Sequence, residues 1–411
     1  MFDVPFFRFE PSPLVLDYAT FKPIVESFFN DASVPDTALQ ARARHLLRVL
    51  EDPDASCYIY TPAWYEHNET RGPRPKRLTA RRVFAAMYRT AADLGLPTGS
   101  RYVSACVLAC GHLAENVPRP YTFAQEMAQS LSVLAVDVWA VRMWSTLTPR
   151  PDRIMVPNLG GVMKPELLAR DAYSCLKTGQ VDLSAPPAMS GEREDLECAR
   201  ICHMPLTEYH KEWLPETSQW LADFYEHYLG VDISAIPMLR AENHLLLSPR
   251  SCELFYQWTW TFKPTEIPNR YQVINSRREN DGDGGARDGD FVTFENHDPK
   301  GSRHILEPAE LPSRDALLVH AAYTSVRHLS GFMDESKDFL DDPNFSFLGR
   351  TGERRTYSKE CEACSYEEKE KDSLEEEKVM DDSEGESSTA SRRGGRLRRA
   401  AHTLKGLFIC G

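Results

Sequence analysis

The chain has little of what marks a membrane or secreted protein. Its longest apolar stretch, residues 124–147, is interrupted by Glu126, Asp137 and Arg142, whereas a membrane span needs about 20 nearly uncharged residues. The first residues show no basic region followed by an apolar run, so we expect no signal peptide. The ten cysteines are scattered along the chain, which favours reduced thiols over a disulfide framework. We therefore expect an intracellular protein outside the membrane, in the nucleus or the cytoplasm.

Positive charge is also in short supply. The chain has 48 Lys and Arg against 61 Asp and Glu, a formal net charge of −13, which is unusual for a protein that covers DNA with a broad surface. Much of this charge is local, because residues 367–386 hold eleven acidic residues against three lysines and so carry −8 of the −13. The rest of the chain is only mildly acidic.

Length and composition indicate more than one folded region. A chain of 411 residues with 42% hydrophobic residues exceeds one ordinary core. We expect a mostly helical region over residues 1–150, a mixed region over 165–333, and a disordered tail over 335–411 that is acidic first and then basic. Together these regions predict an α+β protein.

Helix signals are clearest in the first region. Thr79, Thr122 and Asp36 are expected N-caps, and Gly95 is expected to end a helix. The predicted helices of this region cover residues 23–29, 36–50, 79–94, 100–114 and 122–147. In the mixed region we expect short β-like pieces at Cys175 and 196–202, strands at 259–262, 270–274 and 290–294, and helices at 207–229, 249–258 and 312–331.

Three segments of the mixed region form an ordered pattern. Residues 170–179 read RDAYSCLKTG, residues 196–205 read LECARICHMP, and residues 243–255 read NHLLLSPRSCELF. The pattern resembles the fungal group of HNH endonuclease domains, in which Arg-Asp-x-x-x-Cys-x-x-Thr-Gly precedes Ala-His-Ile-x-Pro, then an Asn, then a His before Phe. The order and most of the spacing agree, although Pro205 falls two residues late. The resemblance covers roughly residues 130–332.

The resemblance implies a ββα-metal (HNH-like) domain, here with added strands and a closing helix. In that family a β-hairpin and a helix grip one divalent metal. A His at a strand end activates water for attack on a phosphodiester, an Asn orients that His, and a second His on the helix binds the metal. The resemblance places Arg200 at the general-base position, Asn243 at the orienting position and Cys252 at the metal-ligand position.

Both substitutions count against DNA cleavage. A guanidinium stays protonated, so Arg200 cannot serve as a general base, although its fork matches phosphate oxygens. A Cys252 thiolate would bind zinc, whereas magnesium and similar hard ions prefer oxygen ligands. A divalent ion such as magnesium, manganese or zinc is therefore a doubtful cofactor. A repurposed zinc site that joins Cys198, Cys202 and Cys252 is a further alternative.

Each of these positions also has a structural interpretation. Arg200 is more typical of a structural or salt-bridging residue than of a phosphate ligand. Asn243 is typical of a residue that satisfies a turn, and Cys175 of a small buried residue beside one.

Three other histidines are candidates to replace the missing base. They are His244, His210 and His203, the last of which requires a shifted strand register. A rescue by any of them is the less favoured interpretation.

Other motifs favour simpler interpretations. The Cys-x-x-Cys at residues 361–364 lacks two further ligands. Residues 281–290 lack the ligand order of a calcium loop. The arginines of residues 392–399 indicate a solvated basic tail, a nuclear-import signal or a nucleic-acid contact.

Three functions remain open from the sequence. The first is a metal-dependent HNH-type endonuclease, impaired because both motif histidines are replaced. The second is a non-catalytic pseudo-nuclease that binds nucleic acid or a protein. The third is an interaction protein that binds through its charged tails.

Overall fold

The computed structural model describes most of the chain up to residue 333. The described residues are 16–52, 55, 78–116, 122–144, 160–202, 215–237, 240–276, 285–298 and 309–333. All of them belong to one compact unit, Met1–Gly349, and a second unit covers Arg350–Gly411. Helices and small sheets share the first unit, which confirms the predicted α+β class.

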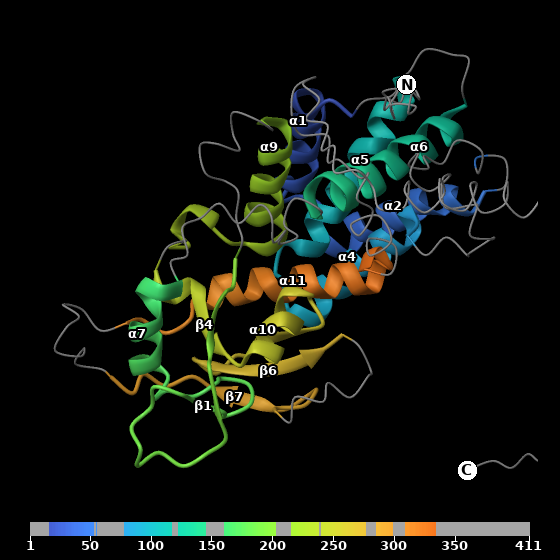
Figure 1. Cartoon of the computed structure of the whole chain (residues 1–411). Helices are drawn as coiled ribbons and strands as arrows, with labels where there is room; N and C mark the ends of the chain where they lie inside the picture. Colours follow the sequence, from blue (N-terminus) through green and yellow to red (C-terminus); the bar gives the residue numbers. More distant parts are fainter. Residues whose placement is uncertain are drawn as a thin grey trace, which may run out of the picture. The chain divides into compact units, whose positions relative to one another are not determined.

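The helical region contains the helices that the sequence predicts (Figure 1). They are α1 (Tyr18–Phe29), α2 (Asp36–Leu47) with the 3-10 turn η1 (Arg48–Glu51), α4 (Ala80–Leu94), α5 (Gly99–Glu115), α6 (Phe123–Ser132) and the π-helix η4 (Val133–Trp144). Two predicted ends are confirmed, because the Thr79 side chain accepts a hydrogen bond at the start of α4 and Gly95 ends α4 with φ +65°. Thr122 caps α6 in a capping box with Gln125, which satisfies otherwise unpaired N–H groups.

One predicted cap is wrong. Pro35, not Asp36, holds the N-cap position of α2, and its side chain makes no cap hydrogen bond. Asp36 lies in the first helical turn, and its carboxylate accepts a 2.6 Å hydrogen bond from Arg101 on α5. The Arg101 guanidinium also donates to the Phe29 and Val34 carbonyls. Asp36 therefore helps to fix α2 against α5 rather than to cap its own helix.

The predicted helix over residues 122–147 is divided. It begins as α6 and continues as the π-helix η4, and residues 145–147 lie outside the described part. Trp139 and Trp144 of η4 are fully buried, so this apolar stretch belongs to the core. No helix in the described part of the chain is long and apolar enough to cross a membrane.

The strands form three small sheets. They are β1 (Val181–Asp182), β2 (Arg193–Glu194), β3 (Glu197–Arg200), β4 (His244–Leu247), β5 (Trp260–Pro264), β6 (Arg270–Asn275) and β7 (Phe291–Thr293). β3 pairs with β4 and β5-β6-β7 form a meander, both antiparallel, whereas β1 and β2 are parallel. The strands predicted at 196–202, 259–262, 270–274 and 290–294 are thus confirmed within a few residues.

The β-like piece expected at Cys175 is wrong. Ala172 and Tyr173 have φ values of +48° and +57°, so the chain turns sharply there and cannot continue as a strand. Ser174 makes only an isolated bridge to Val181. The motif that contains Cys175 is therefore a compact turn.

The remaining helices complete the unit. They are α7 (Gly160–Arg170), α9 (Pro215–Asp223), the π-helix η6 (Phe224–Leu229), the 3-10 turns η7 (Ile233–Ala235) and η8 (Ala241–Asn243), α10 (Pro249–Tyr256) and α11 (Arg314–Ser330). The predicted helices at 249–258 and 312–331 are confirmed, with Pro249 in the first turn of α10 and Gly331 ending α11 with φ +82°. Pro215 begins the described part of the helix predicted at 207–229.

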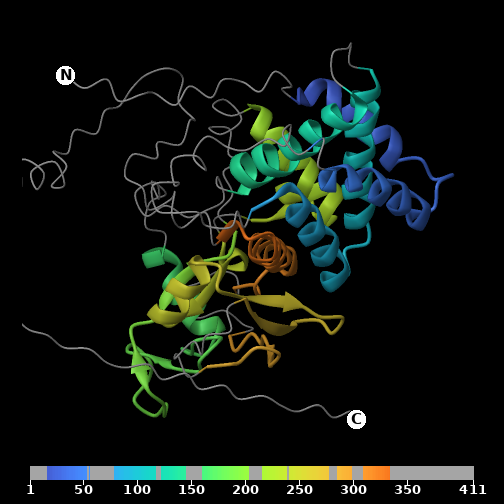
Figure 2. The same cartoon turned by 90° about the vertical axis from the view of Figure 1, so that its right-hand side faces the viewer.

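The insertion between β3 and β4 packs into the helical region. The Tyr18 hydroxyl donates to Asp223 at 2.8 Å, and the Tyr228 hydroxyl donates to the Met87 carbonyl at 2.7 Å. α11 packs against both α4 and β5, and in Figures 1 and 2 this helix, in orange, runs beside the strands. One continuous core therefore includes residues from both predicted regions.

Several predictions lie outside the described residues. They concern the N-terminal residues 1–15, the Gly-rich part of the 281–290 loop, the Cys-x-x-Cys at 361–364, the arginines at 392–399 and the tail as a whole. His203 and His210 also lie outside them.

Candidate functional site

The Arg-Asp pair of the first motif segment forms a buried clamp. The Arg170 guanidinium donates to both carboxylate oxygens of Asp171, at 2.7 and 2.8 Å. It also donates to the main-chain carbonyls of Ala241 at 2.9 Å and His244 at 3.1 Å. Both charged side chains are buried, so the pair replaces water with a complete set of partners. The clamp joins the end of α7 to the segment that leads into β4.

The rest of this motif segment attaches to β4 and α10. The Cys175 sulfur accepts hydrogen bonds from the Thr178 N–H at 3.4 Å and from the Ser248 N–H at 3.2 Å. The Leu176 N–H donates to the Leu246 carbonyl at 3.1 Å. Gly179 has φ +74°, a conformation that favours glycine. The structural interpretation of Cys175 therefore agrees with its contacts.

Asn243 is fully buried and joins the two strand ends. Its side-chain oxygen accepts from the Cys202 N–H at 2.8 Å, and its amide nitrogen donates to the Cys202 carbonyl at 3.1 Å. Its own carbonyl accepts from the Ile201 N–H at 2.9 Å. Asn243 thus extends the β3–β4 pairing beyond Arg200, and it holds in place the strand end at which the resemblance places the general base.

Arg200 ends β3 directly opposite His244. Its main-chain N–H donates to the Tyr256 hydroxyl at 2.9 Å, whereas its side-chain Nε is buried and has no hydrogen-bond partner. Burial lowers the pKa of Arg200, but a guanidinium remains charged at neutral pH. The side chain is therefore a half-buried cation and not a general base.

Cys252 lies on α10, which packs against β3 and β4, and its side chain is buried. Burial raises the pKa of the Cys252 thiol, and the neighbouring Glu197 carboxylate raises it further. The raised pKa disfavours the thiolate form that a metal ligand must supply. Tyr256, four residues later on the same helix face, interacts with Cys252, and its hydroxyl accepts the hydrogen bond from the Arg200 N–H. The sequence reasoning missed Tyr256, although its helical spacing from Cys252 was the available signal.

The residues at the motif positions do not fit a divalent metal. No group of three His, Cys, Asp or Glu side chains within the described residues is arranged to hold a metal ion. In the proposed cysteine set, the Cys202 thiol donates to the Ala316 carbonyl at 3.5 Å, and burial raises the pKa of Cys198 to about 11, which disfavours its thiolate. A protonated thiol and a guanidinium offer magnesium none of the oxygen ligands that it prefers.

Among the described residues, His244 is the histidine that pairs directly with Arg200 across the two strands. It is buried, and its Nδ1 lies 2.8 Å from the Arg240 carbonyl. That contact requires the proton on Nδ1 and leaves Nε2 as an acceptor. Burial lowers the pKa of His244, and the nearby charges of Arg200 and Arg170 lower it further. His244 is therefore a neutral imidazole with a fixed tautomer.

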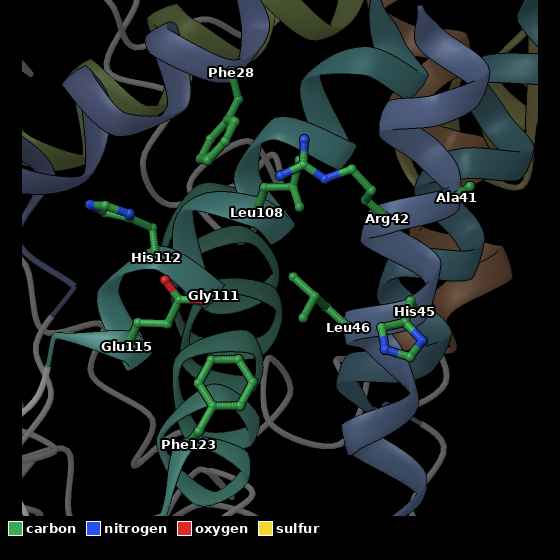
Figure 3. A pocket seen from close by; sticks show the side chains of 10 residues that line it. All are labelled: Phe28, Ala41, Arg42, His45, Leu46, Leu108, Gly111, His112, Glu115 and Phe123. Atoms are coloured by element: carbon green, nitrogen blue, oxygen red, sulfur yellow. The ribbon is translucent and has the colours of Figure 1, made fainter. Parts of the chain in front are cut away.

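A separate hollow of about 630 Å³ lies in the helical region. Arg42 and Leu46 extend from α2 toward Leu108 on α5 (Figure 3). Its lining mixes apolar side chains with Arg42, His45, His112 and Glu115 and includes none of the motif residues. The sequence pattern therefore does not point to this hollow.

Comparisons with models of known protein families, with curated proteins and with solved structures found no match for this chain. The interpretation of the site consequently rests on the three sequence segments and on their geometry.

Proposed function

We propose that residues 165–333 hold an HNH-like ββα scaffold that acts as a binding module and does not hydrolyse phosphodiester bonds. The observation that carries the proposal is the convergence of the three sequence segments on β4. Arg170 binds the main chain on either side of Asn243, Cys175 binds the start of α10, and Asn243 binds the end of β3. The antiparallel β3–β4 pair followed by α10 also has the element order that the resemblance implies.

The loss of catalysis follows from the chemistry at two positions. Arg200 cannot accept a proton, and the Cys252 thiol is kept protonated by burial and by Glu197. The other motif side chains are engaged in buried structural hydrogen bonds. This combination retains the scaffold and removes the base and the metal ligand.

Nicking of supercoiled plasmid tests the proposal. The purified full chain is incubated with magnesium, manganese, zinc or EDTA, with Asn243→Ala in parallel. We expect no nicking by the wild type in any metal. The double variant Arg200→His, Cys252→His is expected to gain metal-dependent nicking, because it restores both functional side chains on the existing scaffold. Metal-dependent nicking by the wild type that Asn243→Ala abolishes would refute the proposal.

A second candidate function is a nuclease in which His244 is the general base. The observation that favours it is the fixed neutral tautomer of His244, in which Nε2 is the unprotonated nitrogen. The same assay with His244→Gln separates the two functions. Nicking by the wild type that is lost in His244→Gln would support this second candidate.

A further inference from the structure

Arg200 carries a positive charge that the described structure does not balance. Its side chain is half-buried, and its Nε is buried without a hydrogen-bond partner. Among the described residues no carboxylate forms an ion pair with it, and its one electrostatic neighbour apart from His244 is the Tyr256 hydroxyl. A charge removed from water without a partner is costly, so an arrangement of this kind favours an anion from outside.

The surroundings of Arg200 also favour an anion. Directly paired residues of an antiparallel ladder share one face, so the Arg200 and His244 side chains lie on the same side of β3 and β4. His244 is neutral, and its pKa is lowered in part by the positive charges of Arg200 and Arg170. Asp171, which lies beside Arg170, is already bound on two oxygens by that guanidinium.

We propose that Arg200 is a binding site for a phosphate group, supplied by a nucleic-acid backbone or by a free nucleotide. The planar guanidinium fork presents paired N–H donors that match two phosphate oxygens. The arginine that replaces the general-base histidine is thus a phosphate-binding side chain at the position where the HNH-like scaffold would hold a scissile phosphodiester. This inference rests on the proposed function, because it assigns the ligand of the same site.

Fluorescence anisotropy in EDTA tests the site. The full chain is titrated into labelled single-stranded and duplex DNA, and AMP or inorganic phosphate then competes for the site. Arg200→Met is compared with Arg200→Lys and with Arg89→Ala, a control arginine that is exposed on α4 and pairs with Asp93. We expect Arg200→Met to weaken DNA binding about tenfold or more. The slope of log affinity against log salt concentration should also become shallower by about one, the value expected for one lost phosphate contact. Arg200→Lys should bind more weakly than the wild type but more tightly than Arg200→Met. The control variant Arg89→Ala should bind as tightly as the wild type.

Thermal unfolding without ligand gives a second readout. Removing an unbalanced, half-buried charge should raise the melting temperature of Arg200→Met by about 2 °C or more. Weaker binding with preserved folding supports the site. A DNA-dependent signal identifies a nucleic-acid backbone as the source. Binding of fluorescently labelled AMP in a parallel titration, without DNA binding, identifies a free nucleotide.

Two results would overturn the inference. In the first, the wild type binds neither DNA nor AMP nor phosphate. In the second, Arg200→Met binds as tightly as the wild type. The two experiments test separate claims. Plasmid nicking by the wild type would refute the proposed function, whereas the binding titration in EDTA, which measures no cleavage, decides the phosphate site.

Discussion

Replacing Arg170 with alanine should lower the free energy of unfolding by about 3–5 kcal/mol, because one partner of a buried ion pair is removed. The change leaves the Asp171 carboxylate buried and without its two guanidinium hydrogen bonds. It also leaves three main-chain carbonyls, those of Ala241, His244 and Glu310, without a charged donor. Each hydrogen bond to a charged group contributes about 1.5–3 kcal/mol, and the contributions are not additive.

Urea unfolding measures this loss. Tryptophan fluorescence and circular dichroism should be recorded together, because coincident transitions show that one free energy describes the change. The double variant Arg170→Met, Asp171→Leu is the matched comparison. It removes both charges and should recover most of the stability, since an apolar pair of similar size is often as stable as the buried ions. If Arg170→Ala stays folded and its free energy of unfolding falls by less than about 1 kcal/mol, the buried Arg170–Asp171 pair does not stabilise the fold as argued.

Two further predictions concern Asp182 and Tyr228. Burial alone raises the pKa of Asp182, but hydrogen bonds from Ser184 and other donors lower it overall. Because the pKa of Asp182 is lower in the folded state than the unfolded value of 3.8, its ionised carboxylate stabilises the fold at pH values above 3.8, and this stability is lost as the pH falls below 3.8. In acid unfolding, Asp182→Asn should therefore show a weaker dependence of stability on pH than the wild type. An unchanged pH dependence would contradict this. Tyr228→Phe removes a buried hydrogen bond to α4 and should cost about 1 kcal/mol in urea unfolding. A change near zero would show that this bond does not hold the insertion in place.

Local signals predicted the parts of the fold that depend on local chemistry. Thr79 and Gly95 bound α4 as their cap preferences indicate, and Pro249 begins α10. The strand β3 and the helix α10 lie where the motif order places them. For the ends of α4 and the start of α10, the deciding interaction lies within a few residues of the signal.

Tertiary contacts decided the parts that could not be predicted. α7 contains Pro165, which argues against a helix interior, but contacts with β3 and β4 hold the helix in place. The turn at Ala172 and Tyr173 needs positive φ in two residues that do not favour it. The resemblance singled out Arg200, Asn243 and Cys252 as candidates, but their contacts and the fixed tautomer of His244 depend on partners from distant segments.

The position of the insertion has a consequence for folding kinetics. β3 and β4 are neighbours in the sheet, but the chain between them includes α9 and η6, which pack on α1, α4 and α5. These strands cannot meet as a local hairpin, because closing so long a loop costs entropy before any contact compensates for it. High contact order of this kind slows folding. We therefore expect the helices to form first and the strand ends at Arg200 and Asn243 to assemble late, so that a lesion in the distant helical region delays the site without altering any of its residues.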